Sequence, residues 1–156
     1  MRVHELHREQ VVPRPIEEVF PFFAAAENLN ALTPPWLEFR ILTPLPVRMA
    51  PGTLLDYRIR WRGIPLRWRT RIEIWEPGVR FVDTQVRGPY RLWHHTHTFD
   101  RLPDGGTRLT DHVRYALPLG PLGQVTHGLL VRRDVVAIFD YRAARIAALF
   151  GTVDGP

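Results

Sequence analysis

The sequence predicts an α+β fold in which a curved antiparallel sheet of about seven strands wraps around a long C-terminal helix. Residues 37–117 consist of short segments in which apolar and polar residues alternate, separated by turns that contain Pro or Gly. This pattern is typical of antiparallel hairpins. Residues 122–150 then carry apolar residues at steps of three and four, which predicts an amphipathic helix. A sheet and a helix that each have one apolar face bury both faces by packing together.

Two short helices are predicted after a first strand over Val3–Val12. Pro15 suits the first turn of a helix, and the apolar residues of Ile16–Phe23 recur at helical spacing. Asn28 can cap a second helix over Leu29–Leu32, which the following Thr-Pro-Pro sequence ends.

Six further strands follow, each bounded by a turn signal. We place them at Leu37–Thr43, Thr53–Arg62, Leu66–Trp75, Val79–Arg87, Arg91–Leu102 and Thr107–Leu117. The turns include Gly63-Ile64-Pro65, Gly88-Pro89-Tyr90 and Pro103-Asp104-Gly105-Gly106. Because every connection is short, neighbouring strands are expected to pair as antiparallel hairpins.

The C-terminal helical pattern extends to Phe150. Its apolar stripe comprises Leu122, Val125, Leu129, Val136, Phe139, Ala143, Ile146 and Phe150. Arg132 interrupts the stripe, and Gly123 and Gly128 weaken its first half. A bend or a second helix is therefore expected near Val131–Asp134. Residues 1–150 are predicted to form a single domain, and residues 151–156 a C-terminal tail.

The composition is that of an ordinary globular protein and excludes several classes. Of 156 residues, 45% are hydrophobic and 24% are charged. No apolar run reaches the ~18–20 residues of a membrane span. The N-terminal residues lack the apolar core of a signal peptide. The chain has no cysteine, so disulfides and thiol chemistry are excluded, and a cytoplasmic location is expected.

All 21 basic residues are arginines, and the formal net charge is +5. Alternation places six of them on the outward face of one hairpin; this arginine ladder comprises Arg58, Arg60, Arg62, Arg67, Arg69 and Arg71. A solvated surface explains the ladder most simply. The alternative is an anionic partner, because directly opposed like charges repel. Nucleic acid is not expected, since no nucleic-acid motif is present and the aromatic residues of these strands point inward.

The strand at 91–102 carries the strongest site signal in the chain. Alternation gives one face Trp93, His95, His97 and Phe99. The turn at 88–90 sets His95 opposite Asp83. A loop over 103–105 sets His97 opposite Asp111. Opposed side chains lie ~4.5–5.5 Å apart at Cβ, so each histidine can pair with a carboxylate.

This polar cluster stands in an aromatic-rich apolar wall, which is the usual composition of a small-molecule site. The candidate ligand-binding residues are Tyr57, Trp68, Asp83, Gln85, Trp93, His95, His97, Asp111 and Tyr115. In one interpretation the His–Asp pairs only satisfy one another in the interior. In another they orient a bound, mostly apolar molecule.

Two further interpretations assign chemistry to His95, His97 and Asp111. As candidate catalytic residues they would transfer protons, because a histidine held by a carboxylate acts as an acid or base near neutral pH. No nucleophile motif or cofactor fingerprint accompanies them, so no cofactor is expected. As metal ligands they would form a set of two histidines and one carboxylate. No further histidine is expected to join this set, and we predict no metal site.

Three segments resemble one protein family. The first is Glu27-Asn28-Leu29 with Thr33–Phe39. The second is Gln85–Trp93, which leads into His95-Thr96-His97. The third joins Thr110-Asp111, Tyr115 and Leu117–Gly123 to Ile138–Arg142. Together they resemble the SRPBCC superfamily (START/Bet v1-like), and within it the ligand-binding branch.

The resemblance implies a helix-grip fold with a cavity between the sheet and the long helix. It also implies that the chain binds a small lipophilic molecule there. The alternative that it implies is an enzyme of the cyclase or dehydratase kind, in which the cavity His and Asp residues act as general acid and base. Because this superfamily hosts several activities, the fold alone does not choose between them.

Overall fold

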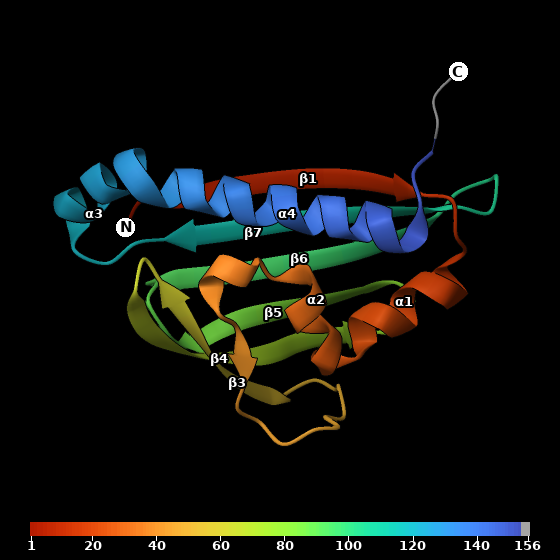
Figure 1. The fold of residues 1–156 in the computed structure, drawn as a ribbon, viewed down its shortest axis with the longest axis horizontal. Coiled ribbons are helices and arrows are strands. Elements are labelled where there is room, and N and C mark those ends of the chain that lie inside the picture. The colour runs from red at the N-terminus through yellow and green to blue at the C-terminus, as the bar shows by residue number, and fades with distance from the viewer. Residues whose placement is uncertain (154–156) are drawn as a thin grey trace.

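Seven strands form one antiparallel sheet in the computed structural model, which describes residues 1–153 (Figure 1). Their order across the sheet is β1-β7-β6-β5-β4-β3-β2. The strands are β1 (His4–Val12), β2 (Arg40–Ile41), β3 (Leu54–Trp61), β4 (Ile64–Glu76), β5 (Arg80–Arg87), β6 (Leu92–Arg101) and β7 (Thr107–Ala116). From β3 to β7 each strand pairs with the next along the chain, as the short connections predicted, and β1 closes the far edge against β7.

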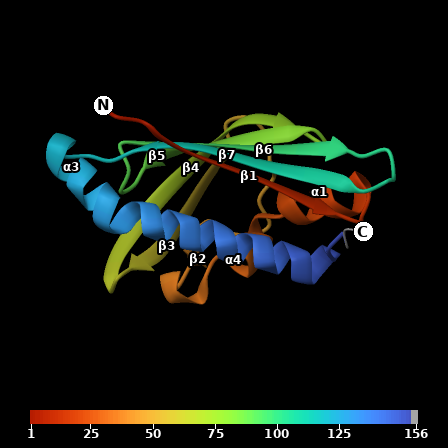
Figure 2. The same cartoon turned by 90° about the horizontal axis from the view of Figure 1, so that it is seen from above.

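The helices lie on one face of this sheet. After β1 come α1 (Ile16–Ala24) and α2 (Leu29–Leu32). After β7 come α3 (Gly120–Thr126), a π-helical segment (His127–Val131) and α4 (Arg132–Phe150). Figure 2 shows α3 and α4 as one long helix that runs across the sheet. The predicted helix-grip fold, with two short helices after the first strand, is confirmed.

The core occupies the space between the sheet, α1 and α4. One cluster joins β1, α1, β6 and α4 through Val12, Phe20, Phe99 and Ile146. A second joins β7 to α4 through Val113, Tyr115, Val135 and Phe139. Packing a strand face against a helix stripe removes both from water, which is the main favourable contribution to folding. Within the described residues, no helix is long and apolar enough to cross a membrane.

Two predicted strands differ from the structure at their ends. The expected strand Leu37–Thr43 is reduced to β2, because Pro35–Leu37 forms a 3₁₀ turn and Glu38 takes a left-handed conformation. The turn between β3 and β4 is Arg62-Gly63, not Gly63-Ile64-Pro65. Arg62 and Gly63 have φ of 49° and 83°, the left-handed pair that a two-residue hairpin of type I′ requires.

The predicted apolar stripe of the long helix is wrong in its first half. Phe139 and Ile146 are buried as predicted, but Val135 is buried in place of the predicted Val136, and Leu122 and Leu129 are 62% and 69% exposed. Two structural facts account for this difference. Figure 1 shows α3 extending beyond the end of the sheet. The π-helical segment, which ends at Val131 where the predicted bend begins, also has more residues per turn than an α-helix. The apolar residues on its two sides therefore do not continue one α-helical stripe.

Candidate ligand-binding cavity

A cavity of about 400 Å³ lies between the inner face of the sheet and the helices. Strands β3 and β4 supply much of its wall, and β5, β6, α1, α2, α4 and the start of α3 supply further residues. The wall is mostly aliphatic and aromatic, with Ile59, Leu66, Trp68, Ile72, Trp93 and Phe139 among its residues. Its volume and composition are those of pockets that enclose small molecules.

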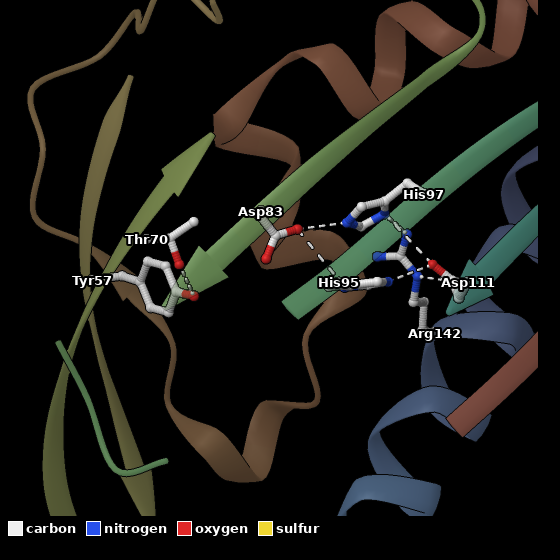
Figure 3. Close-up of polar contacts among 7 residues, drawn as sticks. All are labelled: Tyr57, Thr70, Asp83, His95, His97, Asp111 and Arg142. Carbon is white, nitrogen blue, oxygen red and sulfur yellow. Dashed lines mark hydrogen bonds and ion pairs between the residues drawn. The ribbon is translucent and has the colours of Figure 1, made fainter. Parts of the chain in front are cut away.

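Polar groups gather at the part of the wall formed by β5 and β6. Strand register places Asp83 opposite His95, and His97 opposite Asp111, as the turns predicted. The hydrogen bonds, however, run diagonally. His95 Nε2 lies 2.7 Å from Asp111 Oδ1. His97 Nε2 lies 2.6 Å from Asp83 Oδ2, and the two imidazole rings stack with centroids 3.6 Å apart (Figure 3).

Arg142 enters this network from α4. Its Nε lies 3.4 Å from Asp111 Oδ2, and its Nη2 lies 3.3 Å from His97 Nδ1. The side chain is only 12% exposed. Figure 3 shows the guanidinium between His97 and Asp111, at the side of the histidines away from Tyr57. Helix α4 therefore supplies a charged group to a cluster otherwise built from the sheet.

Arg142 determines where the proton of His97 lies. A guanidinium can only donate hydrogen bonds, so Nδ1 of His97 accepts from Nη2 of Arg142. The proton of the neutral ring is then on Nε2, which donates to Asp83. Burial lowers the pKa of His97 to about 4, and the nearby His95 and Arg142 act in the same direction. His97 is therefore a neutral donor near pH 7.

Both carboxylates in the network are ionised. Burial alone would raise the pKa of Asp111, but the Arg142 charge and the hydrogen bond from His95 lower it far more. Burial would likewise raise the pKa of Asp83, and the hydrogen bond from His97 with the neighbouring charges lowers it overall. Within residues 1–153, Asp83 Oδ1 has no hydrogen-bond partner. One carboxylate oxygen of the cavity wall thus remains available to a bound molecule.

A metal ion suits this cluster poorly. The potential ligand atoms of Asp83, His95 and His97 lie within 4.8 Å of one another. A histidine that binds a metal normally donates its other N–H to an acceptor. The other nitrogen of His97 faces Arg142, which is a donor. Metal binding through Nε2 of His97 would set two N–H groups against each other, so the geometry favours the hydrogen-bonded network.

Six of the nine predicted ligand-binding residues line the cavity: Tyr57, Trp68, Asp83, Trp93, His95 and His97. The Tyr57 hydroxyl lies 3.0 Å from Thr70 Oγ1, and burial raises the pKa of Tyr57 well above its usual range. Trp68 stacks on Tyr57 and meets Trp93 edge to face. Its buried indole N–H has no hydrogen-bond partner among the described residues.

The other three predicted residues lie elsewhere. Gln85 closes the β5–β6 turn, donating to the Tyr90 carbonyl at 2.6 Å and accepting from the Tyr90 amide at 3.0 Å. Asp111 lies behind the histidines and lines a separate pocket of about 50 Å³. Tyr115 bonds His127 at 2.8 Å beyond the cavity wall. Gln85 pairs with the inward-facing Thr70 of β4, but its amide does not reach the cavity because it bonds the turn backbone.

Two features of the site were not predicted. Arg142 lies three residues after Phe139 and four before Ile146, so helical spacing alone could have placed it on the inward face. The second is a clasp across the cavity, in which Asp134 of α4 accepts from the Trp61 indole at 2.7 Å and from Arg62 Nη2 at 3.0 Å. No local pattern links residues so far apart in sequence.

The arginine ladder is exposed but largely ion-paired. Three arginines form ion pairs with nearby carboxylates: Arg60 with Glu38, Arg69 with Asp56, and Arg71 with Glu73. The closest N–O distances of these pairs are 2.9, 2.8 and 2.8 Å. Arg62 leaves the predicted outward face, because its left-handed turn conformation directs it to Asp134 of α4. Four of the six arginines are therefore ion-paired within the described chain, whereas Arg58 and Arg67, which lie directly opposite each other, are not.

The comparisons with known proteins agree with this architecture. A family model described as "Polyketide cyclase / dehydrase and lipid transport" matches residues 12–138. The search of curated proteins gives no significant match.

Solved structures share the fold at low sequence identity. Protein CV1439 from Chromobacterium violaceum is 19% identical over 98% of this chain and 100% of its own, with a TM-score of 0.70. A START superfamily protein from Mycobacterium smegmatis is 13% identical over 94% and 99%, with a TM-score of 0.67. A Thalictrum norcoclaurine synthase point mutant, solved with a transition-state analogue, is 13% identical over 95% and 96%, with a TM-score of 0.67.

Proposed function

Because this chain belongs to the family of polyketide cyclases, dehydrases and lipid-transport proteins within the SRPBCC superfamily, we propose that it binds a small, mostly apolar molecule in the cavity beneath α4. The observation that carries the proposal is the contrast within the wall. About 400 Å³ of space is enclosed mainly by apolar side chains. The polar groups converge at Asp83, His95 and His97, where they can orient one end of a ligand.

The wall also indicates what that end of the ligand carries. Asp83 Oδ1 is an unpaired acceptor, so it favours a hydroxyl or amine that donates a hydrogen bond. The Tyr57–Thr70 hydroxyl pair lines the same cavity and can accept or donate. The remainder of the ligand would be a ring system or short chain that contacts Ile59, Leu66 and Trp93.

Native mass spectrometry of freshly purified protein provides the first test. We expect an excess mass of a few hundred daltons over the denatured chain, as a retained lipophilic ligand would produce. A native mass equal to the denatured mass would contradict a tightly held ligand and would require the titration below.

A titration with N-phenyl-1-naphthylamine, whose fluorescence rises in apolar surroundings, tests whether the cavity itself binds. Leu66→Trp fills the cavity wall and should raise the dissociation constant about ten-fold or more, because it removes the space that shields the probe from water. Leu54→Trp is the matched control: Leu54 is 44% exposed on the same hairpin and does not line the cavity. Equal binding by both variants would place the probe outside the cavity.

A second candidate function, proton-transfer catalysis of the cyclase or dehydratase kind, rests on the His95–Asp111 contact. If Nε2 of His95 donates to Asp111, Nδ1 carries the lone pair, and it lies 3.8 Å from Asp83 Oδ2 at the cavity wall. A histidine held in this way can act as a general base towards a carbonyl compound. His97 is less suited, because Arg142 occupies its Nδ1 and Asp83 its Nε2.

Deuterium exchange separates the two functions. With 2-acetylnaphthalene in deuterated buffer, an active base would catalyse exchange at the methyl group, and His95→Gln would abolish this catalysis. A binding protein would hold the ketone with no exchange above the buffer rate. His112→Gln, which changes a partly exposed histidine of β7 that does not line the cavity, is the control.

A further inference from the structure

Helix α3 presents an apolar face that no other described segment covers. Leu119 at its start is 72% exposed, and Leu122, Val125 and Leu129 are 62%, 58% and 69% exposed. Leu122 and Val125 lie three residues apart, so they share one side of α3, and Leu129 follows in the π-helical segment. We call these four residues the α3 apolar face. A group of large, solvent-exposed apolar side chains marks an interaction surface.

The charged residues of the segment that carries this face are basic, and Asp134, which follows them, pairs with Arg62. No acidic residue occurs from 112 to 133. Arg132 and Arg133 follow the apolar face directly, and Arg91 lies beside its base, where its amide bonds the Ala116 carbonyl at 2.9 Å. All three arginines are exposed, and none of them has an ion-pair partner within residues 1–153. A partner that covers this end must therefore supply negative charge at its rim and apolar surface at its centre.

The cavity opens beside this face. Leu119 is largely exposed and also lines the cavity, together with Pro118 and Gly123. The hairpin turn at 88–90 contributes Pro89 and Tyr90 to the same part of the wall. Figure 1 shows α3 as the most protruding element at this end of the molecule. A surface that receives α3 would thus also meet the entrance of the cavity.

We infer that the α3 end of the molecule docks on an anionic lipid bilayer, with the α3 apolar face in the acyl boundary and Arg91, Arg132 and Arg133 at the phosphates. Apolar helix faces flanked by arginine bind membranes in this way. A second copy of the chain fits less well. A stable interface needs about 800 Å² from each partner, more than four side chains supply, and the arginines of two copies would repel. Docking does not require a ligand in the cavity.

Vesicle co-flotation tests the inference. Wild-type protein should float with phosphatidylcholine vesicles that contain phosphatidylglycerol, and much less with phosphatidylcholine alone. Leu122→Ser with Leu129→Ser should lower the partition coefficient about ten-fold or more. Arg132→Gln and Arg133→Gln should each lower it about five-fold. These positions are exposed, so the variants should fold, and circular dichroism checks that they do.

Matched controls change residues of the same kind elsewhere. Leu42→Ser with Leu45→Ser alters leucines that are 40% and 49% exposed away from α3, and Arg58→Gln with Arg67→Gln removes charge from the outer face of the sheet. Neither pair should change the partition coefficient. Equal loss in the controls would overturn the inference. So would a dimer, detected by analytical ultracentrifugation, that the Leu122/Leu129 double variant dissociates.

Discussion

His95 and His97 lie two residues apart on one strand, yet their surroundings give them different roles. His97 is enclosed between Asp83, Arg142 and the Phe81 ring, with which it stacks at 4.0 Å between centroids. His95 has one nitrogen on Asp111 and the other near Asp83, without a hydrogen bond. Alternation along β6 predicted their shared face but could not distinguish their partners.

The buried state of His97 makes stability depend on pH. Its pKa is lowered from 6.5 to about 4 on folding, so between these values the unfolded chain binds a proton that the folded chain does not. Stability therefore falls as pH drops from 6.5 towards 4. His97 should contribute about 2 kcal/mol to the loss between pH 7 and pH 5.

Urea unfolding at pH 7 and pH 5 measures this contribution. His97→Gln should be less stable at pH 7, because a buried hydrogen bond is altered, but it should lose about 2 kcal/mol less than wild type on acidification. An equal loss of unfolding free energy in both proteins would show that titratable residues other than His97 cause the pH dependence.

At the scale of elements, α3 and the π-helical segment depart most from the predicted pattern. Two glycines in these segments differ in whether a side chain would fit. A Cβ on Gly123 would lie 2.2 Å from the Pro118 carbonyl oxygen, whereas a Cβ on Gly128 would meet no heavy atom within 4 Å. The close approach at Gly123 lets α3 begin directly after β7. Gly128 has no such requirement and only lowers helix propensity.

Substitution by alanine should therefore have opposite effects at the two positions. Gly123→Ala should destabilise by about 1–3 kcal/mol or more, since backbone must move. Gly128→Ala should stabilise by about 0.5–1 kcal/mol through helix propensity. Chemical denaturation followed by circular dichroism measures both. Two changes of the same sign would show that the contact with Pro118 does not position α3.

At the scale of the whole molecule, contacts between distant segments close one side of the cavity. Asp134 joins the tip of the β3–β4 hairpin to α4 through Trp61 and Arg62, and both Asp134 and Trp61 line the cavity. Exchange of a bound molecule past this clasp requires the hairpin tip and the helix to separate. If the cavity holds the proposed ligand, the strength of these contacts should affect how fast it exchanges.

Asp134→Asn should speed ligand exchange while leaving most of the stability intact. Removing the charge weakens a partly exposed ion pair, which is worth about 1 kcal/mol or less. The dissociation rate of N-phenyl-1-naphthylamine, measured by stopped-flow fluorescence, should rise severalfold. Asp140→Asn, which loosens the exposed pair with Arg8 away from the cavity, should leave the rate unchanged. An unchanged rate in Asp134→Asn would indicate another entrance.

The sequence by itself determined the order of the elements, the inward face of β6 and the register that brings Asp83 and Asp111 to the two histidines. These follow from alternation and turn length, which act between near neighbours. The same local signals misplaced Gln85, whose amide serves its own turn, and Leu122, which extends past the sheet. Local pattern does not show where a neighbouring element ends.

Only the tertiary structure decided which carboxylate each histidine bonds, that Arg142 enters the cluster, and that Asp134 spans the cavity. The histidine–carboxylate bonds join neighbouring strands across 16 and 14 residues, whereas Arg142 and Asp134 reach the sheet across 31 and 73 residues. The contacts from α4 depend on the distance and angle between this helix and the sheet. Those quantities arise when the apolar faces pack together. A charged side chain on a helix then reaches the partners that packing places within hydrogen-bond distance, which no local rule specifies.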